Sequence, residues 1–204
     1  MAKGLLFIIS GPSGAGKGTV YNEVIARRPE IKKSISVTTR APRPGEVEGV
    51  HYYFRTLDQY QEMIAHGEFL ETAQVYRNCY GTPKAPVFEM LKNGDDVLFE
   101  IDTLGVKQIK ARYPESIAIF VMPPSFEILE ERLRGRGTES EEAIIRRLSE
   151  AKSELGKYQM FDYIVFNDDV ETAIREVVSI IDAEKRKVKN NLAEIQCILN
   201  SRKN

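Results

Sequence analysis

The amino-acid sequence predicts an α/β fold in which a parallel β-sheet is flanked by helices on both faces. The first observation is a set of apolar runs without polar alternation, as expected of strands buried on both faces. These runs are Leu5–Ile9, Val97–Ile101, Ile117–Val121 and Tyr163–Phe166. The second observation is that amphipathic helical segments separate the runs along the chain. The third is a glycine-rich loop that joins the first run directly to a helix.

The composition is typical of a globular domain without bulk attraction for nucleic acid. The chain has 204 residues, of which 42% are hydrophobic and 29% charged, and its formal net charge is −1. Its two cysteines, Cys79 and Cys197, provide no disulfide framework. No apolar run is long enough to span a bilayer, and the first residues lack the features of a signal peptide. We therefore expect a cytoplasmic location and no nucleic-acid or membrane partner, while monomer and homo-oligomer both stay open.

A phosphate-binding loop follows the first strand. The sequence matches G-x-x-x-x-G-K at Gly11, Gly16 and Lys17, between a predicted strand and a predicted helix. Glycines let backbone N–H groups converge on phosphates, and the helix N-terminus adds a partial positive charge. A plain glycine-rich turn is the alternative, but motif and context agree here. The sequence predicts a P-loop NTPase-type sheet whose loop binds nucleotide phosphates through Gly11, Pro12, Ser13, Gly14, Ala15, Gly16, Lys17, Gly18 and Thr19.

The segment after the first helix carries two arginines on a stiff loop. The helix is expected from Lys17 to Arg28, before a proline, and a short strand from Ser34 to Val37. Prolines and glycines then exclude regular structure around Arg40 and Arg43. These arginines could be solvated surface charges, the usual environment of arginine. Held rigidly near a phosphate loop, they suit a second anion, because guanidinium binds phosphate through two donors.

Six segments resemble motifs of the guanylate kinases, in the same order along the chain. They are Ser36–Phe54, Phe69–Thr82, Val97–Gly105, Phe120–Ser125, Arg132–Leu148 and Phe166–Asp169. The resemblance covers Gly4 to about Ala183 and implies a single domain over residues 1–204. Its expected parts are a core (4–38, 96–134 and 158–184), a GMP-binding lobe (39–95), a lid (135–157) and a C-terminal helical extension (185–204).

The resemblance also implies roles for particular side chains. The GMP phosphate would be held by Arg40, Arg43, Tyr52 and Tyr80. The guanine edge would be read by Ser36, Glu71 and Thr82. Asp102 would lie near the bound nucleotides and Mg²⁺. The lid arginines Arg132, Arg136 and Arg147 would contact the ATP phosphates, and Arg147 would also lie near GMP. Asn167 would lie on the adenine side of ATP. The residues implied in catalysis are Lys17, Arg40, Arg136 and Arg147.

Glu71 has a physical reason to read guanine. It lies within an apolar stretch, and strand alternation would place Phe69, Glu71 and Ala73 on one face, so the carboxylate faces inward and needs a partner. Guanine offers two adjacent donors, N1–H and the N2 amine, which one carboxylate can accept together. Tyr52 and Tyr80 are more ambiguous, because aromatic residues in such a sequence are equally typical of the core.

The implied activity is that of an ATP:GMP phosphotransferase, which gives ADP and GDP with Mg²⁺ and serves purine nucleotide metabolism. Gly18 stands where the general motif has Ser or Thr, so Mg²⁺ would be held largely by phosphate oxygens and water, with Thr19 and Asp102 nearest. Two alternatives stay open. One is a catalytically inactive interaction module, which would usually lack the P-loop lysine. The other is a kinase of a phosphorylated sugar, which would not need Glu71 and Thr82.

The remaining segments are expected to be helical, with one hinge. Gly135 and Gly137 bracket Arg136 and predict a lid that closes over bound nucleotides. A helix capped at Ser140 follows this break. The other expected helices are Leu57–His66, Pro83–Leu91, Thr103–Arg112, Ser125–Arg134 and one long helix from Val170 to about Leu199.

Overall fold

The computed structural model describes residues 3–75, 77–135 and 140–201. Its larger sheet is entirely parallel, in the order β2-β7-β1-β8-β9. The strands are β1 (Leu6–Ser10), β2 (Lys32–Lys33), β7 (Val97–Glu100), β8 (Ile117–Met122) and β9 (Tyr163–Phe166). The predicted α/β fold with a parallel sheet is therefore confirmed.

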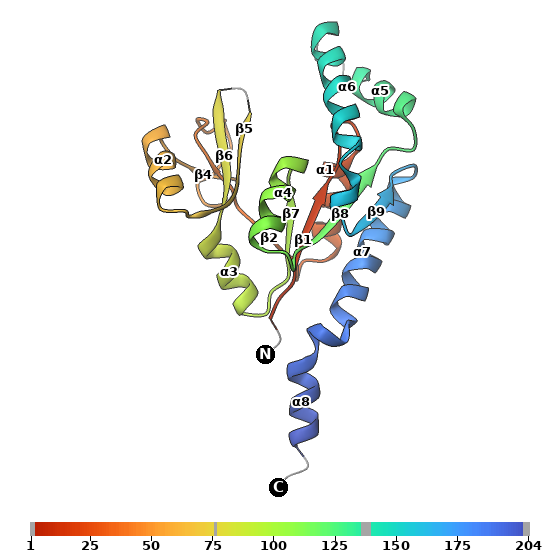
Figure 1. Cartoon of the computed structure of the whole chain (residues 1–204). Coiled ribbons are helices and arrows are strands. Elements are labelled where there is room, and N and C mark those ends of the chain that lie inside the picture. Colours follow the sequence, from red (N-terminus) through yellow and green to blue (C-terminus); the bar gives the residue numbers. More distant parts are fainter. Residues whose placement is uncertain (1–2, 76, 136–139, 202–204) are drawn as a thin grey trace.

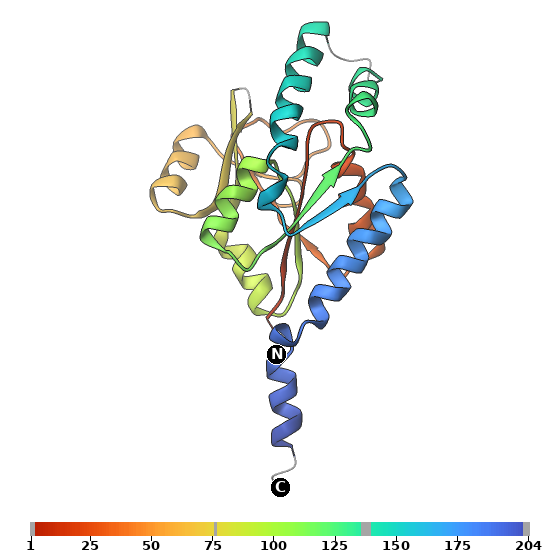
Figure 2. The same ribbon diagram turned by 45° about the vertical axis from the view of Figure 1, so that its right-hand side comes forward.

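Helices cover both faces of this sheet (Figures 1 and 2). On one face lie α1 (Lys17–Arg27) and α7 (Val170–Arg186), and on the other lie α3 (Lys84–Lys92) and α4 (Thr103–Arg112). The side chains of β1 alternate between the two cores, Phe7 and Ile9 into the first and Leu6 and Ile8 into the second. All four are at most 1% exposed, which confirms a strand buried on both faces.

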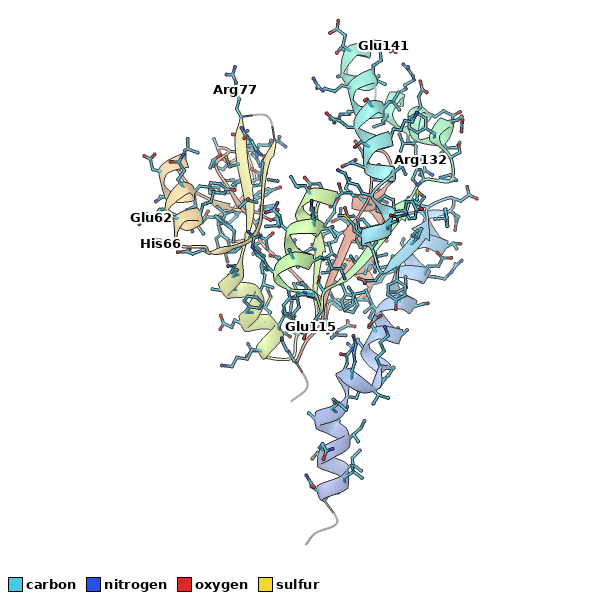
Figure 3. The ribbon with its side chains drawn as sticks, in the orientation of Figure 1. Glu62, His66, Arg77, Glu115, Arg132 and Glu141 are labelled. Atoms are coloured by element: carbon cyan, nitrogen blue, oxygen red, sulfur yellow. The ribbon has the colours of Figure 1, made fainter. Side chains whose placement is uncertain are left out.

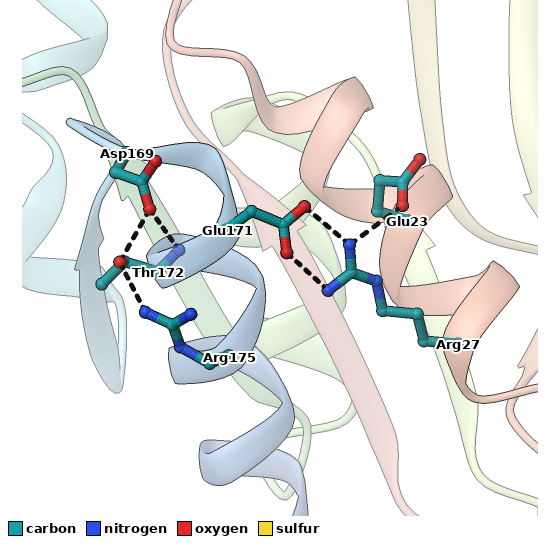
Figure 4. Close-up of polar contacts among 6 residues, drawn as sticks. All are labelled: Glu23, Arg27, Asp169, Glu171, Thr172 and Arg175. Carbon is teal, nitrogen blue, oxygen red and sulfur yellow. Dashed lines mark hydrogen bonds and ion pairs between the residues drawn. The ribbon is translucent and has the colours of Figure 1, made fainter.

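Polar contacts at the surface join α1 to α7, as Figure 4 shows. Both Nη atoms of Arg27 donate to Glu171, at 2.9 and 2.8 Å, and Nη2 also reaches Glu23 at 3.3 Å. Exposed ion pairs of this kind contribute little to stability. The apolar contact beneath, where Val24 and Val177 are fully buried, contributes more.

A second sheet, in the order β4-β3-β6-β5, lies beside the first. Its elements are β3 (Val37–Thr38), β4 (Tyr53–Phe54), β5 (Phe69–Val75) and β6 (Asn78–Pro83), with α2 (Leu57–Ala65). The expected strand Ser34–Val37 is wrong. Lys32 donates its N–H to Asp96 O in the first sheet, whereas Val37 pairs with the second, so the chain crosses between sheets at residues 34–36.

The pairing of β5 with β6 shifts register between Phe69 and Glu71. Because of this irregularity, Phe69, Leu70 and Glu71 are all buried in succession instead of alternating. Glu71 does face inward, as predicted, and is 5% exposed.

The segment expected to form the lid, residues 135–157, contains α6 (Glu141–Leu155), which packs against α5 (Phe126–Arg134) of the expected core. They meet through buried Leu129, Leu133 and Ala151. The predicted cap at Ser140 is confirmed, because its side chain accepts the Ala143 N–H at 3.3 Å. Arg136 and Gly137 lie outside the described residues.

The C-terminal segment is not one helix, so the expected continuous helix to Leu199 is wrong. After α7 come a 3₁₀ turn, Val188–Asn190, and then α8 (Leu192–Asn200), which extends away from the sheets in both views (Figures 1 and 2). The side-chain amides of Asn190 and Asn191 donate to the carbonyls of Glu184 and Lys185, each at 2.7 Å, and so end α7. Another 3₁₀ turn, Tyr158–Met160, precedes β9. In the part of the chain that the structure describes, no helix is long and apolar enough to cross a membrane.

Candidate active site

The loop between β1 and α1 forms an open cleft of about 400 Å³, here called the P-loop cleft. It is lined by Ser13, Gly14, Gly16, Lys17, Gly18, Thr19, Asn22 and Glu100. Gly16 has φ +84° immediately before the first residue of α1, a conformation that residues with a Cβ rarely adopt. The nine predicted loop residues thus occupy one continuous segment from the end of the strand to the first turn of the helix.

Glu100 is a residue of this cleft that sequence reasoning did not assign. A Cβ atom at Gly18 would already lie 3.2 Å from Glu100 Oε1, so the carboxylate stands beside the position where the general motif has a hydroxyl. Burial raises the pKa of the Glu100 carboxyl, while the nearby Lys17 ammonium acts in the opposite direction. Its position as the last residue of a buried parallel strand was the available sign, because such strand ends meet at the ligand-binding edge of the sheet.

A second open cleft, of about 250 Å³, lies between the two sheets and is here called the second cleft. Three predicted residues line it: Ser36, Tyr52 and Thr82. Glu100 lines this cleft as well as the P-loop cleft. The two clefts therefore adjoin at one carboxylate, and ligands in them would be neighbours.

Behind the second cleft, Glu71 is paired with Thr82. The Thr82 hydroxyl donates to Glu71 Oε1 at 2.6 Å in a buried contact. Burial raises the pKa of the Glu71 carboxyl, the Thr82 hydrogen bond opposes this, and the charge of Asp102 adds to it. On the side of α4, a Cβ at Gly105 would lie 3.3 Å from Glu71 Oε2, so the second oxygen faces a position without a side chain.

At the rim of the second cleft, Arg40 is engaged by Glu46, a residue that sequence reasoning did not assign. The Arg40 guanidinium donates to Glu46 Oε1 at 2.7 Å, and the backbone N–H of Arg43 donates to Oε2 at the same distance. These contacts lower the pKa of Glu46 to about 2. Arg40 also lies over the ring of Tyr52, 5.4 Å from its centroid, and the Tyr52 and Tyr80 rings meet edge to face at 6.0 Å. The Arg43 side chain is exposed.

The comparisons with known proteins point to one family. The family model described as guanylate kinase matches residues 3–184. The chain belongs to the guanylate kinase family. It is 52% identical over 189 residues to a guanylate kinase of Carboxydothermus hydrogenoformans, which covers 93% of each chain. It is 53% identical over 186 residues to a guanylate kinase of Clostridioides difficile, and the match covers 91% of each chain. The crystal structure of guanylate kinase from Anaplasma phagocytophilum aligns with a TM-score of 0.75 at 32% identity, over 95% of this chain and 94% of that one.

Membership of the guanylate kinase family confirms the resemblance drawn from the sequence. Asn167, which follows the edge strand β9, and Arg132 lie beside the P-loop. There Arg132 Nη2 donates to the backbone oxygen of Asn167 at 3.0 Å, and Asn167 Nδ2 donates to Ala15 O at 2.8 Å. Arg132, labelled in Figure 3, comes from α5, and its Nη1 is buried without a hydrogen-bond partner among the described residues. Arg147 is half-buried in α6.

The oxygen groups available for a metal ion in this guanylate kinase-family site are few. Asp102 caps α4, with Oδ1 accepting the Gly105 N–H at 2.7 Å, and Thr19 is exposed in the P-loop cleft. Within residues 3–75, 77–135 and 140–201 no group of three or more His, Cys, Asp and Glu side chains could hold a metal. Carboxylate and hydroxyl oxygens fit Mg²⁺, which usually keeps several waters and binds through one or two carboxylates plus phosphates.

Proposed function

We propose that this chain transfers the γ-phosphoryl group of ATP to GMP, giving ADP and GDP. The observation that carries the proposal is that the P-loop cleft and the second cleft adjoin at Glu100, with Lys17 on one side and the Glu71–Thr82 pair on the other. A donor and an acceptor bound in the two clefts would be neighbours, as direct transfer requires. The reaction serves purine nucleotide metabolism by recycling GMP.

No covalent enzyme intermediate is needed. The phosphate of GMP is already an anionic nucleophile, so the chain has to position the two substrates and neutralise their charge. Lys17 and the lid arginines Arg136 and Arg147 are proposed to stabilise the transferring phosphoryl group, and Arg132 the bound ATP. Arg40, Arg43, Tyr52 and Tyr80 would hold the GMP phosphate. Arg40 would then exchange Glu46 for that phosphate, a partner with more acceptor oxygens.

The base is proposed to be read by Glu71 together with Ser36 and Thr82. The carboxylate would accept from N1–H and the N2 amine of guanine, and the two hydroxyls could donate toward O6. Glu71 is 5% exposed, so an acceptor that lacks these donors would leave a buried carboxylate poorly satisfied. Sites of this kind reject the wrong analogue strongly.

Mg²⁺ bound with ATP would neutralise charge on the phosphate oxygens. Thr19 and Asp102 are the residues proposed to approach it, largely through water, and Glu100 lies nearby in the P-loop cleft. We also propose the division into a core, a GMP-binding lobe at residues 39–95, a lid at 135–157 and an extension at 185–204. The cytoplasmic location and the absence of a nucleic-acid partner stay predictions.

A coupled assay of ADP release tests the function directly. ATP is supplied with GMP, dGMP, AMP or a ribose bisphosphate in turn, and GMP is expected to give the highest kcat/KM. Preference for the ribose bisphosphate would support the sugar-phosphate kinase instead. No turnover with any acceptor would support an inactive interaction module, which the presence of Lys17 and all the P-loop glycines argues against.

A further inference from the structure

We propose that Gln108, on α4, is a positioning residue that holds the Glu71 carboxylate in place for reading the base of the acceptor nucleotide. Gln108 is not among the described residues that line either cleft. It acts through the backbone next to Glu71. The inference deepens the proposed function and rests on it in one respect, that Glu71 accepts hydrogen bonds from guanine.

The strand that carries Glu71 lies at the edge of the second sheet. In the order β4-β3-β6-β5, the strand β5 pairs with β6 on one side. The other side of an edge strand presents backbone N–H and C=O groups that no further strand satisfies. The helix α4, which belongs with the first sheet, packs against β5. The position of Glu71 therefore depends on the partners that α4 offers to this strand.

Gln108 supplies both partners for the backbone of Thr72, the residue after Glu71. Its Oε1 accepts the Thr72 N–H at 3.1 Å, and its Nε2 donates to Thr72 O at 2.8 Å. Only one orientation of the side-chain amide satisfies both groups. A facing residue of a neighbouring antiparallel strand would make the same two bonds. The Gln108 side chain thus takes the place of one residue of a further strand.

Two other residues on the same face of α4 complete the contact around Glu71. Gly105, Gln108 and Arg112 follow the spacing i, i+3, i+7 and so share one helix face. Arg112 Nη1 donates to Leu70 O at 2.7 Å, so the backbone is held on both sides of Glu71. A Cβ at Gly105 would lie 3.3 Å from Glu71 Oε2, so the glycine leaves room for the carboxylate.

The same helix connects Glu71 to the point where the two clefts adjoin. α4 begins directly after Asp102, whose side chain caps it, and this segment follows Glu100 at the end of β7. Glu71 belongs to the second sheet, whereas the P-loop belongs to the first. Gln108 therefore fixes the distance between the carboxylate that reads the base and the place where the two phosphates meet. A small change in this distance is expected to be costly, because transfer depends on alignment of the substrates.

A double-mutant cycle separates positioning of Glu71 from a general structural role. Gln108→Leu removes the donor and the acceptor and keeps a side chain of similar size. It is combined with Glu71→Gln, and each single variant, the double variant and the wild type are assayed for kcat/KM with GMP and with AMP. Lys107→Leu is the matched control, because Lys107 is the neighbouring residue on α4 and is exposed. Calorimetric titration gives the ATP dissociation constant, and thermal unfolding checks the fold.

Gln108→Leu should lower kcat/KM for GMP about tenfold, as expected when the hydrogen bonds to Thr72 are lost. kcat/KM for AMP and the affinity for ATP should stay within about twofold of the wild type, so the GMP-to-AMP ratio narrows about tenfold. In the Glu71→Gln background, Gln108→Leu should cause no further loss with GMP, because Gln108 acts through Glu71. The control should match the wild type throughout.

Three results would overturn the proposal. Unchanged GMP efficiency would show that Gln108 does not position Glu71. Equal losses with GMP and AMP, or a further tenfold loss in the double variant, would assign Gln108 a general structural role. If the wild type itself does not turn over GMP, the proposed function fails instead, and the two failures are thus distinguishable.

A measurement on the unaltered protein decides the matter if the variants do not fold. Because Gln108 satisfies the edge of β5 at Thr72, the backbone amide proton of Thr72 and the side-chain amide protons of Gln108 should exchange slowly with solvent. Hydrogen exchange followed by NMR in the ligand-free protein measures both. Rapid exchange at Thr72, as at a free strand edge, would contradict the proposal whatever the outcome of the kinetic assays.

Discussion

The P-loop cleft and the second cleft are built in different ways. The first takes most of its lining from one continuous segment, residues 13–19, and relies on backbone groups at the start of a helix. The second collects side chains from separate segments, and its polar groups already pair with one another, Arg40 with Glu46 and Thr82 with Glu71. A site made of backbone donors suits any polyphosphate. A site made of paired side chains can select, because the right ligand must replace the internal partners.

The largest effect is expected in the P-loop cleft, from Lys17→Met. Lys17 carries the only charged side chain in residues 11–19, so its loss should lower kcat by roughly 10²–10³-fold, the usual cost of removing one transition-state contact. Steady-state turnover measures this, and circular dichroism checks that the fold is intact. Lys32→Met, at an exposed position, is the control. Turnover within a few-fold of the wild type would remove Lys17 from the mechanism.

Gly16→Ala in the phosphate-binding loop and Gly45→Ala in the loop near the second cleft change two glycines that share the same backbone conformation. The two glycines have φ of +84° and +86°, so each substitution should cost roughly 1 kcal/mol of stability through strain. A Cβ at Gly16 also meets Asn167, whereas one at Gly45 has nothing within 4 Å. Only Gly16→Ala should therefore weaken ATP binding, by about tenfold if one loop donor is lost. ATP affinity is measured for both variants, and thermal unfolding checks their stability. Equal ATP affinity of the two variants would contradict this prediction.

The predictability of the two clefts from sequence follows the same division. Gly11–Thr19 could be identified from spacing alone, because one segment contains the whole motif. The second cleft needed the family resemblance, since Ser36, Tyr52 and Thr82 are brought together only by the folding of a second sheet. The central strands β1, β7 and β8 of the first sheet were likewise predictable, because each contains a continuous apolar run. The two edge strands were not. β2 consists of two exposed lysines, and in β9, predicted to be buried on both faces, Ile164 and Phe166 are 40% and 59% exposed.

What could not be predicted depends on single contacts between distant residues. Glu46 pairs with Arg40 within a loop that has no periodicity, and Asn167 reaches Ala15 across 152 positions. The end of α7 depends on asparagine side chains that bond backward to its carbonyls, without a proline or glycine to mark the break. The register shift in β5 leaves Leu70 and Glu71 both buried, which simple alternation would not allow.

Arg43→Lys is expected to act on the second cleft alone. Lysine cannot reproduce a planar fork with two donors, so KM for GMP should rise roughly tenfold, nearly as much as in Arg43→Ala. KM for ATP should stay unchanged. The two substrates are titrated separately, and an effect confined to ATP would move Arg43 to the P-loop cleft.

The smallest expected effect is a pH dependence that comes from Glu71. Burial raises the pKa of this carboxyl, so it protonates at a higher pH than an ordinary glutamate and then cannot accept both guanine donors. GMP affinity should fall as the pH is lowered from neutral to mildly acidic values. Stability should change in the opposite sense, because protonation favours the folded state when the folded pKa is the higher one. In Glu71→Gln, GMP affinity should retain only the pH dependence that comes from the GMP phosphate. Identical pH profiles of GMP affinity in the wild type and in Glu71→Gln would show that Glu71 is not the titrating group.

The most direct test of selective binding in the second cleft is the ratio of kcat/KM for GMP to that for AMP, in the wild type and in Glu71→Gln. The carboxylate can accept two donors from guanine, whereas adenine presents an acceptor at N1 and no amine at position 2. The wild-type ratio should reach roughly 10⁴–10⁵. Glu71→Gln should narrow it, mainly through lost GMP activity, because an amide accepts through one atom only and turns a donor toward guanine with the other. An unchanged ratio would show that Glu71 does not read the base and would contradict the account of how GMP is chosen.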